Sequence, residues 1–578
     1  MTIPDRSRAT RRDFLRSTGL LAACAVPGAV PGAVVGAAAE PGSSVAAVPA
    51  QDAGAEPAIT TDTIAEAEKL TGIEFTDRER AMILEGMDEN LARYAQRRRQ
   101  VLPNAAAPAT VFDPRLEGMA FDERPTAFEP SRSDPGPVPQ RDEDLAFAPV
   151  TALSRWIERR QLSSRRLTGV YLERLKRIGP ALECVVTLTG DLALRQARRA
   201  DQELAAGRLR GPLHGIPWGA KDLFDTAGIA TTWGAAPYRR RVAETDANVV
   251  RRLEEAGAVL VAKLTLGALA YGDIWFAGRT NNPWNLKQGS SGSSAGPAAA
   301  TVAGLVGFSL GTETLGSIVS PCMRCGATGL RPTFGRVGRS GAMALCWSLD
   351  KIGPICRTVE DCALVLAAIN GHDRGDPSSI DLPLHFDATR PVVGLRLGYD
   401  PAWFEGDGRD LEREVLEAAR GAGLELVEID FPRGPYGALM TILLVEAASA
   451  FETLTLTDAD DDLVWQDPEA WPNTFRQTRF APAIEYVQAQ RLRREVMEMM
   501  AGQFAGVEAL ISPSYAGRLL LVTNNTGHPS LTIRCGFKPD GTPHGITLWG
   551  RLFDEGTLCR IGMALESRLG VWDRRPSL

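Results

Sequence analysis

One stretch of the sequence combines many hydroxyl groups with very little charge. Residues 289–319 read GSSGSSAGPAAATVAGLVGFSLGTETLGSIV, with Glu313 as the single charged residue, and serine and glycine pass directly into apolar sequence. A Gly/Ser linker carries no such apolar content, so we expect the stretch to be buried and its hydroxyls to need partners. Small residues let two backbones approach closely, and glycine adopts positive φ without strain. The composition therefore predicts a site built from serine hydroxyls and main-chain N–H groups.

A serine in this stretch can act as a nucleophile only if a base accepts its proton. The stretch contains no histidine, and the segment GPLHGIPWGAKDLFDTAG, earlier in the chain, carries His214 together with Lys221. A lysine accepts a proton only when it is neutral, and burial lowers its pKa from about 10.4 by up to roughly 3–5 units. The small and apolar neighbours in IPWGAK favour burial, so Lys221 is the candidate base.

Four segments carry a resemblance to a known family. They are GIPWGAKDLFDTAG, SGSSAGPAAA with LGTETLGSIVSP, GATGLRPTFGRVGRSGAMALCWSLDKIGP and NNTGHPSLTIRCGF. In this order, across residues 146–570, they resemble the amidase signature family. That resemblance implies an α/β hydrolase fold with a mixed β-sheet core surrounded by α-helices. It also implies a metal-free Lys–Ser–Ser triad, with Lys221 as base, Ser293 after a cis peptide bond, and Ser317 as nucleophile.

The resemblance implies a mechanism without a cofactor. Neutral Lys221 takes a proton from Ser293, which takes one from Ser317 as Ser317 attacks the carbonyl, and water hydrolyses the resulting acyl-enzyme. Main-chain N–H groups from Thr314 to Ser317 form the oxyanion hole. The expected activity is an amidase that cleaves the carbon–nitrogen bond of a small-molecule or peptide-like amide.

The sequence departs from the family pattern beside the expected nucleophile. Leu315-Gly316-Ser317-Ile318-Val319 stands where family members usually have Gly-Gly-Ser-Ile-Arg. Leu315 adopts positive φ less readily than glycine and places an isobutyl group near the scissile bond. We expect Val319, in place of arginine, to remove a buried charge pair with Glu313. Ser291 also replaces a common glycine, a change that we expect to be minor.

Several further polar and aromatic residues can be explained by structural roles alone. Ser290, Ser291 and Ser294 are expected to bond nearby backbone rather than to react. Asp222 could be an acceptor behind the site or a carboxylate at a helix start. Four other residues could line the substrate channel or simply pack in the core: Trp218, Trp275, Trp347 and His528.

Alternating apolar runs and amphipathic stretches indicate an α/β fold around a buried sheet. We expect strands at residues 258–264, 392–399, 424–431 and 507–513, with helices at residues 246–256 and 410–422 between them. A helix capped by Ser163 or Ser164 carries an apolar stripe of Leu167, Val170, Tyr171, Leu175 and Ile178. Thr76 and Glu79 form a capping box at the start of another helix.

The composition is that of an ordinary globular protein, and it disfavours several partners. The chain has 578 residues, 44% of them hydrophobic, and a formal net charge of −7, so it offers no basic face for nucleic acid. The cysteines after Cys24 are too sparse for a disulfide scaffold. Cys322 and Cys325 have the spacing of half a zinc site, but no second pair follows, so we expect no metal.

The N-terminal residues suggest export. Arg11 and Arg12 precede a run of small apolar residues, so residues 1–39 resemble a twin-arginine signal peptide. Cleavage after Ala39 would give a periplasmic or secreted protein, whereas lipidation of Cys24 would anchor it to a membrane. Residues 40–57 then form a flexible tether, residues 58–145 a helical appendage with a Pro-rich linker, and residues 146–578 the amidase domain.

Two alternatives to an amidase remain at this point. The chain could be an amidotransferase A-type subunit that delivers ammonia to a partner acting on aminoacyl-tRNA, although the export signal and the acidic charge disfavour that role. It could also be a catalytically inactive binding homologue, which the residues at positions 315 and 319 would explain. Either alternative is compatible with a homodimer.

Overall fold

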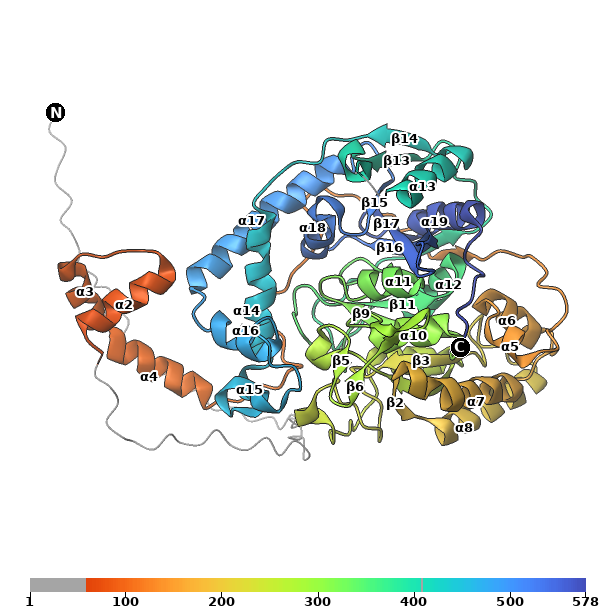
Figure 1. Cartoon of the computed structure of the whole chain (residues 1–578), viewed down its shortest axis with the longest axis horizontal. Coiled ribbons are helices and arrows are strands. Elements are labelled where there is room, and N and C mark those ends of the chain that lie inside the picture. Colours follow the sequence, from red (N-terminus) through yellow and green to blue (C-terminus); the bar gives the residue numbers. More distant parts are fainter. Residues whose placement is uncertain (1–58, 407–408) are drawn as a thin grey trace, which may run out of the picture. The chain divides into compact units, whose positions relative to one another are not determined.

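The computed structural model describes residues 59–406 and 409–578, which all belong to one compact unit, Val45–Leu578 (Figure 1). The expected signal peptide, Cys24 and the tether lie outside the described residues. None of the helices within the described ranges is long and apolar enough to cross a membrane.

A mixed sheet of eleven strands forms the centre of the unit, in the order β14-β13-β15-β17-β16-β10-β11-β9-β3-β4-β2. The pairs β3–β4, β3–β9, β13–β14 and β13–β15 are parallel, and the others are antiparallel. The strands are β2 (Val185–Leu188), β3 (Pro217–Lys221), β4 (Val259–Leu264), β9 (Phe308–Glu313), β10 (Thr328–Arg331), β11 (Lys351–Cys356), β13 (Arg396–Tyr399), β14 (Glu425–Glu428), β15 (Ala509–Pro513), β16 (Ser530–Phe537) and β17 (Pro543–Gly550). The expected α/β fold with a mixed sheet is confirmed.

The expected strands are present but shorter than their apolar runs. The run from Val392 begins as a turn, with Gly394 at φ 80°, so β13 starts only at Arg396. The run that ends at Phe431 leaves the sheet after Glu428, because the neighbouring strand β13 ends at Tyr399. Apolar composition predicted these strands, whereas their ends depend on turns and partners.

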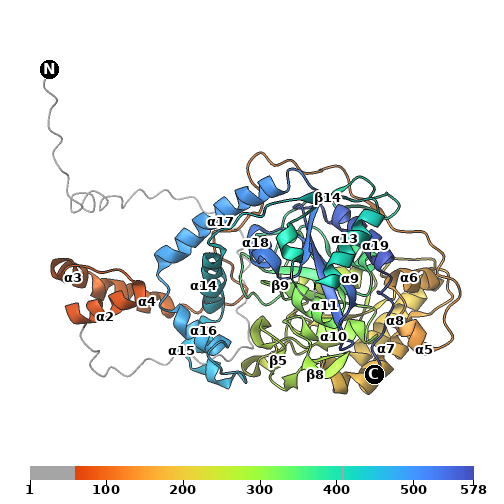
Figure 2. The same ribbon diagram turned by 45° about the horizontal axis from the view of Figure 1, so that its top comes forward.

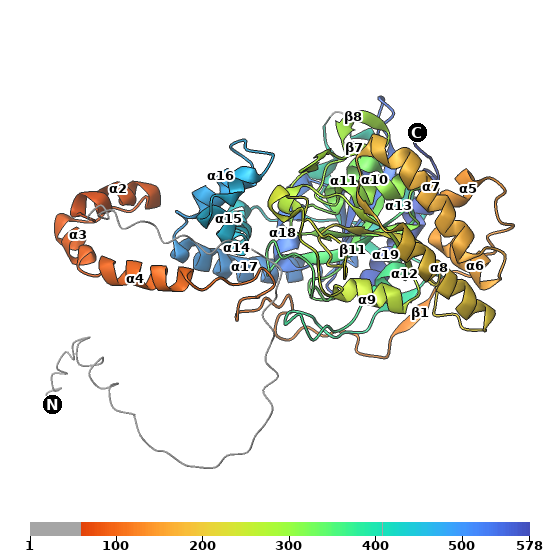
Figure 3. The same cartoon turned by 90° about the horizontal axis from the view of Figure 1, so that it is seen from below.

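Helices cover both faces of the sheet. In Figure 3, α10 (Ala295–Val302) and α11 (Val319–Cys325) lie on one side of β11, and α12 (Val359–Ile369) and α19 (Glu555–Leu569) lie on the other. Along the β2 edge, α7 (Ser164–Leu182) packs beside α8 (Gly190–Ala205). Ser163 caps α7 by accepting from the Arg166 N–H, and all five residues of its expected stripe are buried.

A helical group stands beside this core (Figure 2). It packs α14 (Met440–Ala450) against α16 (Trp471–Thr478) and α17 (Ala483–Gln503), and α17 contacts α18 (Leu519–Thr526). The remaining helices are α5 (Asp142–Ala146), α6 (Val150–Glu158), α9 (Asn248–Glu255), α13 (Asp410–Gly421) and α15 (Glu452–Leu456). Four short strands form two small sheets: β5 (Ile274–Trp275) with β6 (Gly278–Arg279), and β7 (Asn281–Asn282) with β8 (Asn285–Gly289).

The segment before residue 146 is partly helical and partly extended. It contains α2 (Thr61–Thr71), α3 (Asp77–Leu84) and α4 (Met87–Arg98), and the expected capping box of Thr76 and Glu79 starts α3. Neither α3 nor α4 has a buried residue. After α4 the chain runs extended, and β1 (Ala127–Glu129) pairs with β12 (His385–Asp387). The extended part is therefore tied to residues far along the sequence.

Candidate active site

Lys221 is the last residue of β3 and is completely buried. Its Nζ lies 2.8 Å from Ser293 Oγ, 3.1 Å from Ser294 Oγ and 2.8 Å from Thr312 Oγ1. Because β3 lies next to β9 and carries small residues before the lysine, the lysine side chain extends along a packed surface rather than into water. The structure thus brings Lys221 and Ser293 together, as the resemblance implied.

Burial lowers the pKa of Lys221 well below its ordinary value. The negative charges of Asp350 and Glu313 oppose that shift, but their effect is smaller than that of desolvation. No carboxylate within 4.0 Å pairs with Lys221 among the described residues. A neutral amine that contacts a serine hydroxyl is a competent proton acceptor.

The Ser293 loop has a tightly constrained backbone. The peptide bond between Gly292 and Ser293 is cis. A Cβ on Gly292 would lie 1.8 Å from the carbonyl oxygen of Gly272, so only glycine fits at that position. Ser291 has φ 62°, a conformation that favours glycine. The replacement that we expected to be minor thus falls on a left-handed residue, which Asp273 holds by accepting from its N–H at 2.9 Å.

Ser317 lies in the turn between β9 and α11, with its side chain mostly buried. Its carbonyl oxygen accepts from the Ser294 N–H at 3.1 Å, which joins this turn to the Ser293 loop. The positive φ of the turn falls on Gly316, at 85°, and not on Leu315. Leu315 therefore needs no unusual backbone conformation. Within the described residues, the N–H groups of Leu315, Gly316 and Ser317 have no main-chain acceptor, so they are free to stabilise an anion.

The carboxylate of Glu313 holds the turn that contains Ser317 in place. One carboxylate oxygen, Oε2, accepts from the N–H groups of Ile318 and Val319 at 2.8 and 2.9 Å. The other, Oε1, accepts from Arg331 at 2.6 Å and from Asn524 at 2.9 Å. Val319 offers Glu313 no charge, but Glu313 still has a charge partner, because Arg331 reaches it from β10. This pairing keeps the pKa of Glu313 low, at about 2, although desolvation acts in the opposite direction.

A small cavity of about 110 Å³ adjoins this site. Thr312, Thr314, Asp350 and Lys351 contribute to its wall. Asp350 accepts from the Thr314 hydroxyl at 2.6 Å and from two N–H groups of the loop before β11. The cavity therefore reaches the end of β9 that carries the turn with Ser317.

The extended N-terminal segment closes one side of the same cavity through Ala105 and Ala107. Asn104 anchors it: the side chain both donates to the Ala344 carbonyl and accepts from the Ala344 N–H, each at 2.8 Å. The Trp347 indole N–H donates to the Asn104 carbonyl at 3.2 Å. Sequence reasoning missed this contact, because a single asparagine in a Pro- and Ala-rich stretch gives no signal for a partner 240 residues away.

The other candidates are held in structural roles. Ser290 donates to the Ser291 carbonyl, Ser294 to the Thr312 carbonyl, and Ser291 bonds Ser320. Asp222 forms a buried ion pair with Lys263 at 3.0 Å and accepts from Thr232, so it is an acceptor behind the site. Trp218 and Trp275 pack in the core, and Trp347 alone of the three tryptophans lines the small cavity. The sulfur atoms of Cys322 and Cys325 are free and buried.

Known proteins resemble this chain over most of its length. A family profile described as Amidase matches residues 166–559. The chain is 34% identical over 469 residues to the A subunit of glutamyl-tRNA(Gln) amidotransferase from Geobacter metallireducens, covering 71% of this chain and 95% of that protein. A Moorella thermoacetica protein of the same name is 34% identical over 495 residues, covering 75% and 99%.

Solved structures show the same fold. The native peptide amidase of Stenotrophomonas maltophilia aligns with a TM-score of 0.66 and 31% identity, covering 74% of this chain and 98% of its own. An enzyme described as belonging to s-triazine catabolism aligns with a TM-score of 0.68 and 27% identity, covering 75% and 100%. In each alignment about a quarter of this chain lies outside the match.

Proposed function

The chain belongs to the amidase signature family, and from that premise we propose that it is an amidase that hydrolyses a small-molecule or peptide-like amide. One observation carries the proposal: a buried lysine with a strongly lowered pKa lies 2.8 Å from the hydroxyl of Ser293, and the next residue, Ser294, donates its N–H to the carbonyl of Ser317. The altered residues Leu315 and Val319 leave this arrangement intact.

In the proposed reaction, Ser317 Oγ attacks the carbonyl carbon of the amide. Its proton passes to Ser293 as the proton of Ser293 passes to Lys221. The carbonyl oxygen becomes an oxyanion, which the free N–H groups of Leu315, Gly316 and Ser317 stabilise. The hydroxyl of Thr314, the next residue toward β9, donates to Asp350 and contributes to the wall of the small cavity.

The relay then runs in reverse. Lys221 returns the proton through Ser293 to the leaving nitrogen, the carbon–nitrogen bond breaks, and the acyl group stays on Ser317 as an ester. Water attacks the ester with Lys221 and Ser293 again accepting the proton. The products are a carboxylic acid and an amine or ammonia, and the protein returns to its starting state.

The test compares hydrolysis of primary amides, aryl amides, peptide amides, carbamates and esters by the wild type, Lys221→Ala and Ser317→Ala. Each triad substitution should lower kcat by roughly 10³-fold or more. Ser309→Ala is the matched control, since this buried hydroxyl on β9 contacts Thr301 and the Pro297 carbonyl instead of Lys221. Wild-type turnover in both triad variants would exclude the assignment.

A fluorophosphonate that labels serine nucleophiles separates an enzyme from an inactive binding homologue. Labelling of the wild type on Ser317, lost in Ser317→Ala, supports the amidase. A wild type that neither labels nor turns over any class of substrate supports the binding protein.

A second candidate, an amidotransferase A-type subunit, is favoured by the names of the curated relatives. Such a protein would copurify with partner subunits and deliver ammonia to them. The net charge of −7 offers no electrostatic footprint for a tRNA complex. Isolation of the full chain at low salt and analysis of what accompanies it decides between the two: a monodisperse, active chain supports the amidase.

We also propose that the protein is exported, on the basis of Arg11 and Arg12 and the apolar run after them. Substitution of both arginines by lysine should retain the protein in the cytoplasm, as measured by cell fractionation. A wild type that is cytoplasmic in the same experiment contradicts this proposal.

A further inference from the structure

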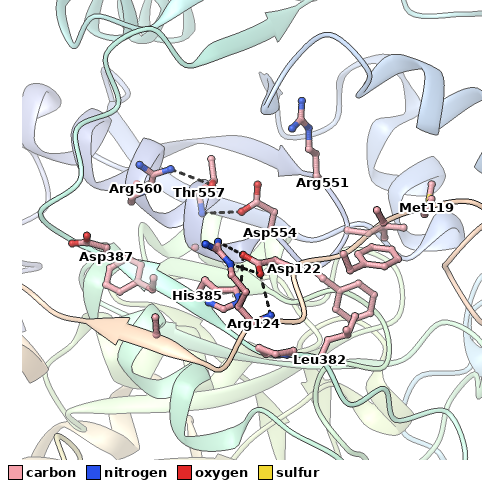
Figure 4. Close-up of a pocket in the computed structure, with 18 of the residues that line it drawn as sticks. Met119, Asp122, Arg124, Leu382, His385, Asp387, Arg551, Asp554, Thr557 and Arg560 are labelled. Atoms are coloured by element: carbon pink, nitrogen blue, oxygen red, sulfur yellow. Dashed lines mark hydrogen bonds and ion pairs between the residues drawn. The ribbon is translucent and has the colours of Figure 1, made fainter.

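A second cavity, of about 900 Å³, lies apart from the candidate active site (Figure 4). Its wall combines the extended segment 119–129, β12, the loop before α19 and the first turn of α19. Lys221, Ser293 and Ser317 do not contribute to it. The reaction proposed above gives this cavity no role.

Arg560 is a cation in this wall without a carboxylate partner. Its side chain is only 9% exposed, and it donates to two neutral acceptors, the Pro391 carbonyl at 3.3 Å and the Thr557 hydroxyl at 3.2 Å. In the part of the chain that the structure describes, no carboxylate lies within 4.0 Å of it. Burial, together with the positive charge of nearby Arg390, lowers the pKa of Arg560, and the carboxylates of Asp554 and Asp387 oppose that shift from beyond ion-pair distance. A buried and poorly compensated cation is costly and favours an incoming anion.

Two of the other three arginines in the wall already form ion pairs. Arg124 forms an ion pair with Asp122 at 2.5 Å, and Arg551 forms one with Glu508 at 3.3 Å. Figure 4 shows Arg124 turned to Asp122, near His385. Arg390, in contrast, is exposed and has no ion pair among residues 59–406 and 409–578.

The acidic residues of the wall have donors of their own. Asp387 accepts from both the N–H and the hydroxyl of Thr389. Asp554 caps α19 by accepting from the Thr557 N–H at 3.3 Å, and burial raises the pKa of this carboxyl group. Glu129 faces Arg132. Asp387 and Asp554 act on Arg560 through their charges, but neither carboxylate forms an ion pair with Arg560 or Arg390 among the described residues.

Two further features point toward a ligand. The N-terminus of the 15-residue helix α19 opens on the cavity, with Gly556 and Thr557 in its wall. The buried ring of His528 also lines the cavity: its Nδ1 bonds the Thr526 hydroxyl, while its Nε2 has no partner within the described ranges. His528 is thus a polar group left open to the cavity, rather than part of the substrate channel.

The remaining wall is apolar. Phe121 and Phe553 form an edge-to-face pair with ring centroids 5.3 Å apart, and Leu382 and Phe386 continue that surface. A volume of this size matches a small organic molecule rather than an inorganic ion, since ligand pockets span roughly 300–1,000 Å³.

We propose that this cavity binds an organic anion whose carboxylate or phosphate head is held by Arg560, Arg390 and the first turn of α19, with an apolar body against Phe121 and Phe553. Charge-assisted hydrogen bonds to the guanidinium groups fix the head. The edge-to-face pair provides the surface for the body.

Titration calorimetry of the full chain tests the site with four probes: 4-phenylbutyrate, phenyl phosphate, inorganic phosphate and the neutral 4-phenylbutanol. The two organic anions should bind, and the comparison between them identifies the preferred head. Inorganic phosphate and the neutral alcohol should each bind at least about tenfold more weakly, because each lacks one of the two interactions. Equal binding of the alcohol would overturn the proposal.

Arg390→Gln and Arg560→Gln should each weaken binding of the better organic anion about tenfold. Arg390 is exposed, so its substitution reports on the ligand without risk to folding, and Arg124→Gln is the matched control because Asp122 already neutralises that charge. Ser317→Ala should bind the probe as the wild type does, which separates this site from the active site. Wild-type affinity in Arg390→Gln and Arg560→Gln, or loss of affinity in Ser317→Ala, would overturn the proposal.

Discussion

At the scale of single residues, Lys221 shows how the fold makes a base from a side chain that is normally a cation. Ordinary lysine is protonated at neutral pH and has no free electron pair to accept a proton. Complete burial against β9 removes the water that stabilises the charge, and the carboxylates of Asp350 and Glu313 act from a distance without forming an ion pair with Nζ. Desolvation therefore dominates, and it favours the neutral amine.

This balance predicts the pH dependence of the reaction. Because the folded pKa of Lys221 is lowered, burial favours the neutral form over the charged one, and kcat/KM should fall on the acid side as protonation removes the acceptor. The kcat/KM of Lys221→Arg should be roughly 10²–10⁴-fold below that of the wild type at every pH, since guanidinium stays charged. A pH–rate profile of both proteins checks this. If Lys221→Arg is still active and its kcat/KM falls at low pH as in the wild type, the titrating group is not Lys221.

Glu313 connects the charge of one residue to the geometry of the turn. Glu313→Gln leaves Arg331 buried without its anion and weakens the bonds to the Ile318 and Val319 N–H groups, so we expect a loss of about 3–5 kcal/mol in the free energy of unfolding. Urea unfolding at neutral pH measures it. Glu425→Gln, an exposed residue of β14, is the control and should change little. A Glu313→Gln protein as stable as the control would show that Arg331 finds another partner.

The same carboxylate has a defined pH window. Its folded pKa of about 2 lies below the ordinary value of 4.5, so the ionised form favours the folded state. The stabilisation is fully present above pH 4.5 and is lost as the pH falls toward 2. The difference in stability between wild type and Glu313→Gln should therefore shrink over that range, as acid-titrated unfolding curves would show.

Sequence reasoning predicted Lys221, Ser293 and Ser317 as the triad because their motifs are local, but it missed groups that approach from elsewhere. Arg331 lies 18 positions from Glu313, and nothing in GLRPT indicates which acid it meets. Likewise, the left-handed φ of Ser291 follows from how Asp273 and Ser320 hold it, which no local pattern shows. Motifs predict which residues are present, whereas tertiary contacts determine their partners.

At the scale of elements, the sheet and most helices followed from apolar periodicity, but the extended segment after α4 did not. We expected a helical appendage with a Pro-rich linker at residues 58–145, and the structure places Ala105 and Ala107 in the wall of the cavity beside the candidate active site. The Ala344 N–H and carbonyl satisfy the Asn104 side chain, much as in strand pairing, and the Trp347 indole N–H donates to the Asn104 carbonyl. A linker that carries such contacts becomes part of the site.

Asn104→Ala should detach this segment from the loop. The loss of two hydrogen bonds leaves the Ala344 N–H and carbonyl without partners, which costs about 1–3 kcal/mol for each group that stays buried. We expect a higher KM and a wider range of accepted amides, because the cavity wall can move away. Kinetics on a series of amides with increasing side-chain size measures this effect.

The matched control is Asn90→Ala, in helix α4, where the asparagine accepts only from the exposed Arg93. That variant should behave as the wild type. If both asparagine variants keep the wild-type preference for amide size, the segment does not limit the substrate.

At the scale of the whole molecule, the described residues before 146 form two parts that differ in their contacts with the rest of the chain. Helices α3 and α4 bury no residue, and the pair of Arg97 with Glu452 is partly exposed, so we expect it to contribute at most about 1 kcal/mol. The extended segment is different, because Phe112 packs edge-to-face on Phe334 with centroids 5.0 Å apart and lies under the Arg493 guanidinium. The boundary expected at residue 145 remains a prediction, and these contacts indicate how to test it.

Two shortened chains make that test. A chain that begins at residue 99 loses α2–α4 but keeps Asn104, Phe112 and β1, and it should retain the wild-type Tm and kcat/KM, since no buried group of the core is exposed. A chain that begins at residue 131 also loses the Phe112 ring, whose removal alone should cost about 3–5 kcal/mol, and exposes Ala344 and β12. It should unfold at lower temperature and lose activity on the amides that the full chain prefers. Equal stability and kinetics of both chains would mean that the amidase domain needs no residue before 131. The extended segment would then cover the site without contributing to stability or activity.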